Sequence, residues 1–165
     1  MWYKSECGKG FGDERSRTFS FDTSNSDEWR CHGYWELPFE GQGHFGGDLD
    51  AWVGLHSDGY IGTCQVASRS GSGGGTAGQL TWKMAKDKLW SQEQQAACGP
   101  TLTCMGNARF CLVETVEECG GCVLLITTFR LRFSRKGELQ IFDGVTSSCL
   151  VSKHHDTFSP VAFWM

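Results

Sequence analysis

The sequence predicts an all-β protein built from antiparallel strands. Short runs in which apolar and polar residues alternate with a period of two recur along the chain, which is the pattern of half-buried strands. Turn signals that contain glycine separate these runs at intervals of roughly 8–12 residues, which is typical of an antiparallel barrel or sandwich. Consecutive hairpins favour an up-and-down barrel of the calycin type. The alternative is a two-sheet β-sandwich, because Val113, Leu124 and Ile126 make a second face apolar and that face needs cover.

The clearest element is the stretch 110–142, which predicts a three-stranded antiparallel meander. Its last turn is Arg135-Lys136-Gly137, a three-residue hairpin loop with glycine at the position that requires a left-handed backbone. This loop pairs Phe133 with Leu139 and Leu131 with Ile141. All four side chains then fall on one face, so the turn chemistry and the apolar pattern select the same register.

The other turn of the meander is predicted at Gly120-Gly121, because both positions of a two-residue loop can take a positive φ at glycine. This loop pairs Cys119 with Cys122 and Leu112 with Phe129. It also places Glu114 on the apolar face, opposite Thr127. A carboxylate on that face must be paired, hydrogen-bonded or protonated. Glu114 is therefore a candidate either for a structural ion pair or for a ligand-facing acid.

A second hairpin is predicted over residues 49–66, with Ser57-Asp58-Gly59 as its three-residue loop. The register pairs Leu55 with Ile61, Val53 with Thr63, Gly54 with Gly62 and Trp52 with Cys64. The two facing glycines leave a shallow trough beside Trp52 in which an aromatic ring can lie flat. That trough serves either internal packing or ligand binding.

The remaining stretches carry weaker signals. Residues 41–47 predict a glycine-rich bend, Asp143-Gly144 predicts a turn, and at most one short helix is expected near residues 86–97. Residues 1–14 are polar and predict a flexible N-terminal arm. Residues 15–165 have the length of a single β-rich domain.

Composition excludes several classes of protein. The chain has 165 residues, of which 39% are hydrophobic and 21% charged, and its formal net charge is −4. No basic cluster of the kind that binds nucleic acid is present, and no apolar run approaches the length of a transmembrane helix. Residues 1–60 hold 5 Lys or Arg against 11 Asp or Glu, so the negative charge is concentrated in the first third.

Nine cysteines are many for this length, and five of them fall within 25 residues: Cys98, Cys104, Cys111, Cys119 and Cys122. This density predicts at least two disulfides and favours an oxidising, non-cytosolic compartment. The N-terminal sequence has no apolar core of a signal peptide, which argues in the opposite direction. Cys119-x-x-Cys122 lacks the setting of a redox motif and a second cysteine pair for zinc, so a structural pair is favoured.

Candidate binding residues come mainly from an aromatic group in the first third of the chain. Trp29, Tyr34, Trp35 and Trp52 lie near glycine-rich and acidic segments. Neighbours in a strand point to opposite faces, so Tyr34 and Trp35 are not both core residues on this pattern. Neither a metal site nor a cofactor is predicted, because the pairs His154-His155 and Cys31-His32 lack the spacing of a ligand set.

Three functions follow as hypotheses. The first is a non-catalytic β-barrel protein that holds a small apolar ligand or docks as a subunit on a larger assembly. The second is a secreted sandwich that binds carbohydrate or protein. The third is an enzyme that uses Glu114 and a histidine as acid and base, although no motif with catalytic geometry supports it.

Overall fold

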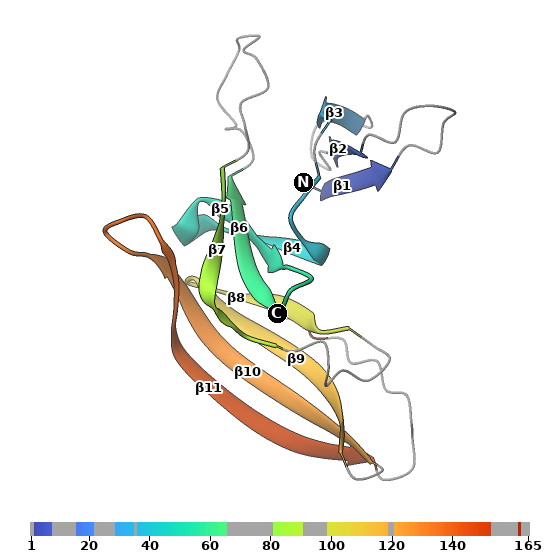
Figure 1. Ribbon diagram of the computed structural model, residues 1–165, viewed down its shortest axis with the longest axis vertical. Coiled ribbons are helices and arrows are strands. Elements are labelled where there is room, and N and C mark those ends of the chain that lie inside the picture. The colour runs from blue at the N-terminus through green and yellow to red at the C-terminus, as the bar shows by residue number, and fades with distance from the viewer. Residues whose placement is uncertain are drawn as a thin grey trace. The chain divides into compact units, whose positions relative to one another are not determined.

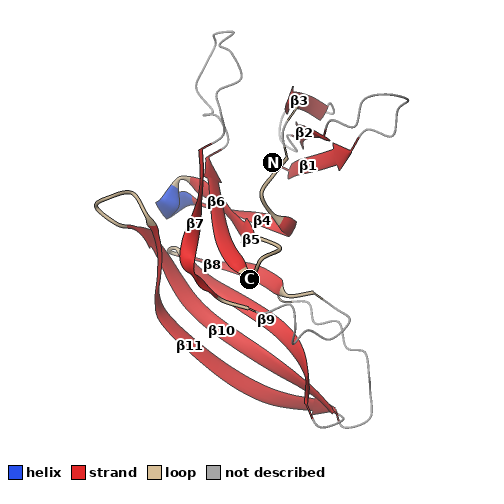
Figure 2. Ribbon diagram, in the orientation of Figure 1, coloured by secondary structure: helices blue, strands red, loops and turns tan. Residues whose placement is uncertain are grey.

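The computed structural model describes residues 2–7, 16–21, 29–34, 36–65, 81–90, 99–118, 121–152 and 162 (Figures 1 and 2). Strands make up about three-quarters of these residues, and no α-helix occurs among them. The predicted all-β class is therefore confirmed. The helix expected near residues 86–97 does not form at its start, because residues 86–88 end a strand; residues 91–97 lie outside the described part.

The chain divides into two compact units, one formed by Met1–Pro38 with Ala67–Leu80 and the other by Phe39–Val66 with Thr81–Met165. The first unit contains an antiparallel sheet of β1 (Trp2–Cys7), β2 (Ser16–Phe21) and β3 (Trp29–Gly33). Strand β1 pairs with β2 along its whole length. The stretch expected to be a flexible arm thus contains a paired strand, and residues 8–14 lie outside the described part.

The second unit contains two four-stranded sheets, each a simple up-and-down meander. The first consists of β4 (Glu40–Gly46), β5 (Ala51–Leu55), β6 (Tyr60–Gln65) and β7 (Thr81–Lys88), with the short 3₁₀ turn η1 (Gly47–Leu49) after β4. The second consists of β8 (Thr101–Gly106), β9 (Arg109–Glu118), β10 (Gly121–Phe133) and β11 (Leu139–Ser152). Strands β9 to β11 are long, so the β8–β11 sheet is the larger of the two (Figure 1).

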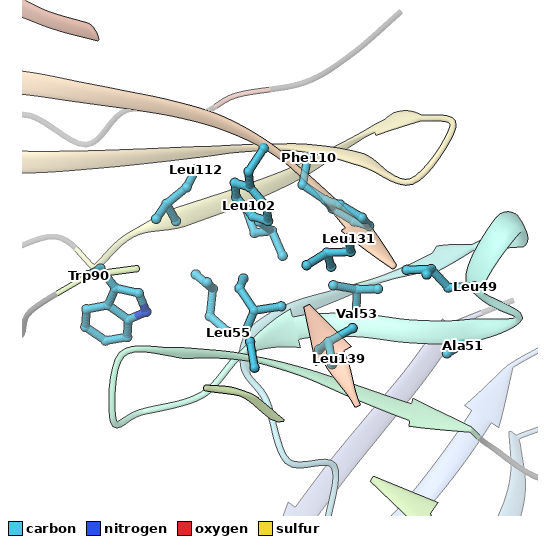
Figure 3. Packing of buried hydrophobic residues seen from close by; sticks show 13 residues of the cluster. Leu49, Ala51, Val53, Leu55, Trp90, Leu102, Phe110, Leu112, Leu131 and Leu139 are labelled. Carbon is cyan, nitrogen blue, oxygen red and sulfur yellow. The ribbon is translucent and has the colours of Figure 1, made fainter. Parts of the chain in front are cut away.

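The inner faces of these two sheets share one hydrophobic core (Figure 3). Alternate residues of β5 and of β10 point into it, and Val53, Phe110 and Leu112 are fully buried there. The cluster runs from Leu49 near η1 to Trp90, which follows β7 (Figure 3). Chain segments far apart in sequence are thus held together by buried apolar area, the main favourable contribution to folding.

The edges of the two sheets lie close together without forming a closed barrel. Strand β7 lies against β11 and β4 against β8, but in the described residues neither pair joins its sheets by a backbone ladder. Side chains bridge both seams: His44 Nε2 lies 2.7 Å from the carbonyl oxygen of Leu102, and Lys86 Nζ donates to Glu138 at 2.9 Å. The sandwich alternative therefore describes this unit better than the calycin-like barrel.

Two predicted hairpins have the predicted register. Strands β5 and β6 pair Leu55 with Ile61 and Gly54 with Gly62. Strands β10 and β11 pair Phe133 with Leu139. Each loop contains glycine with a positive φ at the expected position, 91° at Gly59 and 75° at Gly137.

The predicted register of β9 and β10 is wrong by two residues. Phe129 faces Phe110 instead of Leu112, and Glu114 faces Leu125 instead of Thr127. A shift of two leaves every side chain on the same face of the sheet, so the apolar pattern cannot distinguish the two registers. The observed register brings the rings of Phe110 and Phe129 together, with their centroids 6.0 Å apart.

Two further expectations are corrected by the strands themselves. Asp143-Gly144 is not a turn; it lies inside β11 where the pairing with β10 shifts register. Asp143 takes the left-handed backbone with φ 52° that the sequence suggested for a turn, and here it produces a β-bulge. Residues 41–47 are largely strand β4, which is also irregular between Glu40 and His44.

Candidate functional site

The trough predicted between the facing glycines exists, and the chain's own Phe39 occupies it. A Cβ placed on Gly54 would lie 2.4 Å from Cγ of Phe39, and a Cβ on Gly62 would lie 3.5 Å from the same ring. Gly43 of β4 approaches the ring as well. Because glycine has no side chain, three neighbouring strands together accommodate one aromatic ring. The trough is therefore a packing site for Phe39.

Around Phe39, the face of the β4–β7 sheet that points away from the core is rich in rings. We define this aromatic face by Phe39, Phe45, Trp52, His56, Tyr60 and Trp82. The strand registers place these residues together: Phe45 pairs with Trp52, and both Trp52 and Trp82 pair with Cys64. Trp82 is 50% exposed and Phe45 is 40% exposed. Large apolar side chains therefore remain in contact with solvent on this face.

The rings of the aromatic face form ordered pairs. Phe45 and Trp52 have centroids 5.7 Å apart. His56 and Trp82 are nearly parallel, with an interplanar angle of 5° and centroids 6.4 Å apart. Lys88 Nζ lies 5.4 Å from the centroid of Tyr60, which is a cation–π distance. These contacts arrange the rings relative to one another, and a preorganised surface loses less conformational freedom when it binds a partner.

Charge is distributed unevenly on the β4–β7 sheet. Residues 39–65, which include β4, β5 and β6, contain four Asp or Glu and no Lys or Arg. Strand β7, in contrast, carries Lys83, Lys86 and Lys88 against the single acidic residue Asp87. Asp58 belongs to the acidic part and lies 3.4 Å from Nδ1 of His56. The acidic residues within 39–65 thus lie in β4 and in the turns around β5, and Asp58 adjoins the aromatic face.

Glu114 lies elsewhere, on the inner face of the β8–β11 sheet. Its side chain is buried, and burial raises the pKa of its carboxyl above the ordinary value. Within the described residues no histidine contacts it. Trp52, the other site candidate in this unit, lies on the outer face of the opposite sheet, so the two do not form one site.

Two buried polar atoms have no hydrogen-bond partner in the described structure: Nε1 of Trp90 and Oγ1 of Thr115. Trp90 lies at one end of the core (Figure 3), whereas the side chain of Thr115 points to the opposite face of its sheet from Glu114. Such groups are costly when they stay unpaired. They do not converge, so they do not define a polar site.

The remaining aromatic candidates belong to the first unit. Trp29 begins β3 and pairs with Phe21, Tyr34 follows that strand and is 59% exposed, and Trp35 lies outside the described residues. Trp82 lies outside the aromatic-rich first third of the chain from which the sequence predicted binding residues. Alternation of Trp82 with Lys83 and Thr81 marked a strand, but only the pairing with β6 determines which face the ring occupies.

Among the five candidates for disulfides, Cys104, Cys111 and Cys122 are free thiols in the described structure, so none of the predicted bridges is seen among these three. Cys104 packs against the core, whereas Cys111 lies on the other face of the sheet. Cys122 shares the face of Cys111 but lies about 20 Å further along β10, at roughly 3.3 Å per residue. Cys98 and Cys119 lie outside the described residues. An oxidising compartment therefore stays a prediction.

Other sites receive no support from the described residues. Among them, no three His, Cys, Asp or Glu side chains come together as a metal site would require. His154, His155 and Asp156 lie outside this part of the chain. No helix in the described part is long and apolar enough to cross a membrane.

Fold and site together define an all-β protein with two antiparallel four-stranded sheets, one of which exposes an aromatic face. Residues 4–149 match the family described as "Protein of unknown function (DUF1668)", and the chain belongs to that family. No curated protein and no solved structure matches the chain.

Proposed function

We propose that this chain is a non-catalytic binding protein that docks on a protein partner through the aromatic face. The observation that carries this proposal is the exposure of Trp82 and Phe45, 50% and 40%, on either side of half-buried rings. Exposed large apolar side chains gathered on one face are typical of interaction sites. Trp and Tyr are also the residues that most often anchor protein interfaces.

The partner is expected on the surface and not inside the sandwich. The space between the two sheets holds thirteen buried side chains of the chain itself. A small apolar ligand between the sheets would have to displace well-packed residues such as Phe110 and Val53. We therefore favour binding of a protein partner at the aromatic face over binding of a small apolar ligand between the sheets.

The chemistry of the partner follows from the border of the aromatic face. Because residues 39–65 carry only acidic charges, a partner surface with Lys or Arg beside an apolar contact fits best. Complementary charge at the rim mainly increases the association rate and the specificity. Binding through this rim is accordingly expected to weaken as salt concentration rises.

The test compares Trp82→Ala and Phe45→Ala with Phe142→Ala, a matched aromatic truncation on the opposite sheet. Proteins captured from an extract of the natural source are quantified for each variant, and the affinity is then measured with the purified partner. Loss of an anchor ring should cost about 2 kcal/mol, or roughly a thirtyfold weaker Kd. Unchanged capture by both variants, with unfolding midpoints like the wild type, would refute the proposal.

A carbohydrate is the second candidate, favoured by one observation: the nearly parallel rings of His56 and Trp82. Flat aromatic surfaces can stack on sugar rings, and Asp58 beside His56 supplies a hydrogen-bonding group. Titration of oligosaccharides with tryptophan fluorescence as the readout separates the two functions. Saturable quenching that Trp82→Ala abolishes would favour the sugar, and its absence would favour the protein partner.

A further inference from the structure

Strand β11 forms one edge of the β8–β11 sheet, and the second half of this edge is free in the described structure. Its first half lies near β7, and Glu138, the residue just before β11, accepts a hydrogen bond from Lys86 of β7. From Asp143 to Val151 every residue is exposed. Val145, Leu150 and Val151 are 61%, 54% and 37% exposed. This half of β11 thus presents unpaired backbone groups together with apolar side chains.

Sheet edges of this kind are normally protected against pairing with another chain. The usual protection is charge, proline, a short strand or a bulge within the exposed part. The stretch 144–152 contains no charged residue and no proline. One bulge lies at its start, at Asp143-Gly144, and a second lies near its end, at Val151. Between the two bulges, Val145 to Leu150 form a regular, uncharged strand. The edge therefore retains the properties that allow a further strand to add to the sheet.

The phase of the hydrogen bonds identifies the backbone groups that are available. Ser134 N–H donates to the carbonyl of Glu138, so the even-numbered residues of β10 direct their N–H and C=O groups toward β11. The bond from Leu131 N–H to Ala108 points the opposite way, as this phase requires. On β11 the residues paired with Thr128, Ile126 and Leu124 are Val145, Ser147 and Cys149. Their backbone groups face β10, which leaves those of Thr146, Ser148 and Leu150 for the free edge.

The side chains of the same stretch are arranged almost symmetrically about Ser148. The sequence Val145-Thr-Ser-Ser-Cys-Leu-Val151 has valine at both ends and small residues at its centre. A symmetric dimer uses the same surface on both subunits, so this surface must be complementary to itself. An uncharged, nearly palindromic strand meets that condition, because no like charges oppose each other when it pairs with its own copy.

We infer that two copies of the chain associate by antiparallel pairing of β11 with β11, with Ser148 on the two-fold axis. Ser148 then forms a hydrogen-bonded pair with Ser148 of the second copy, and Thr146 with Leu150. Ser147 faces Cys149 across the non-hydrogen-bonded positions, and the bulge at Val151 ends the regular pairing. The two β8–β11 sheets become one continuous eight-stranded sheet. This interface is separate from the aromatic face, which lies on the other sheet of the unit.

The first test uses the charge at the axis. Wild-type protein at tens of micromolar should sediment as a dimer, whereas Ser148→Lys and Ser148→Glu should each be monomeric, with Kd raised about a hundredfold by opposed like charges. An equimolar mixture of the two variants should recover a heterodimer, because opposite charges then face each other. Gln140→Lys, which adds a charge to the same strand outside the free half, should remain dimeric.

The second test examines the register. Ser147→Cys should form a disulfide with Cys149 of the second copy under mild oxidation, because these positions face each other. Disulfide formation in Ser147→Cys, together with heterodimer recovery, would support the proposed pairing. A monomeric wild type would overturn the inference, and so would failure of the mixed variants to associate when each alone is folded. Cross-linking of the wild type through Cys149 alone would overturn the register with Ser148 on the axis.

Discussion

The position of Phe39 shows what the facing glycines Gly54 and Gly62 accommodate. The two facing glycines predict a trough for an aromatic ring, and both a ligand and the chain itself could fill it. The structure places Phe39 there, 2.4 Å from where a Cβ on Gly54 would be. The glycines are thus required for packing, and the solvent-exposed rings beside them become the better candidates for binding.

The facing glycines allow a matched experiment. Gly54→Ala should lower the free energy of unfolding by about 1–3 kcal/mol, because the new methyl group overpacks against Phe39. Gly62→Ala should have a smaller effect, since its Cβ would lie at an ordinary contact distance of 3.5 Å from the same ring. In a Phe39→Gly background, which also removes the Phe39 Cβ at 2.8 Å from the Gly54 Cβ position, the cost of Gly54→Ala should largely disappear. Urea unfolding of all variants measures this, and additive effects in the double mutant would contradict the packing assignment.

Glu114 should make stability depend on pH. Burial raises the pKa of its carboxyl above 4.5 in the folded state, so between the two values the folded state binds more protons than the unfolded state. Its contribution is therefore favourable at low pH and is lost as pH rises through the folded pKa. Glu114→Gln should match the wild type near pH 4 and be the more stable protein at neutral pH. Parallel stability curves from pH 4 to 8 would show that this carboxyl is not desolvated.

At the scale of the element, the register of each strand pair could be predicted only where a turn had a defined length and a glycine at a required position. Gly59 and Gly137 each demand a left-handed residue at a fixed place in a three-residue loop, so both hairpins were predicted with the right register. Gly120-Gly121 gives weaker information, because a slide by two residues keeps the apolar face intact. Because the register of β9 and β10 was ambiguous, the contact between Phe110 and Phe129 was not predicted.

One dipeptide can also be compatible with two local structures. Asp143-Gly144 is compatible with a turn and with a bulge, since both use a left-handed residue. Only the partner strand decides between them, and β10 continues straight past this point as one strand of 13 residues. The sequence also does not show which distant strands share a face: Trp82 and Trp52 lie on one face only because β6 pairs with both of their strands. Composition therefore suggested a group of aromatic residues, but the sequence alone could not predict that these residues form one face.

The two turn glycines should differ in their tolerance of a side chain. A Cβ on Gly59 would lie 2.2 Å from the carbonyl oxygen of Trp90, whereas a Cβ on Gly137 would meet only the end of Lys83 at 3.2 Å. Both carry a positive φ, so each alanine variant pays a conformational cost of about 1 kcal/mol. Gly59→Ala should be clearly the more destabilising, because it also displaces backbone. Thermal unfolding of the two variants, which should differ by several degrees, checks this, and equal midpoints would contradict it.

At the scale of the whole molecule, the sandwich of the second unit resembles a barrel in most respects. Eight strands of the second unit enclose one core, and the seams between β7 and β11 and between β4 and β8 are bridged by side chains. The absence of a backbone ladder at these seams in the described residues leaves two separate sheets. Their cohesion then depends mainly on the shared core, and less on the exposed bond between Lys86 and Glu138, since surface ion pairs contribute little.

This dependence predicts that one core substitution weakens both sheets equally. Phe129 is 1% exposed and belongs to the cluster that joins them. Phe129→Ala should lower the free energy of unfolding by about 3–5 kcal/mol through lost burial and the cavity left behind. Amide hydrogen exchange should then accelerate in β5 and β6 as much as in β9 and β10, because the four strands open together.

The control for this experiment is Arg135→Ala in the exposed β10–β11 loop, which should change stability by less than about 0.5 kcal/mol. Exchange measured by mass spectrometry resolves the two sheets as separate peptides. Acceleration confined to β9 and β10 would mean that the β4–β7 sheet is stable by itself. In that case the thirteen-residue cluster would not be the element that unites the unit, and the stability of the aromatic face would not depend on the opposite sheet.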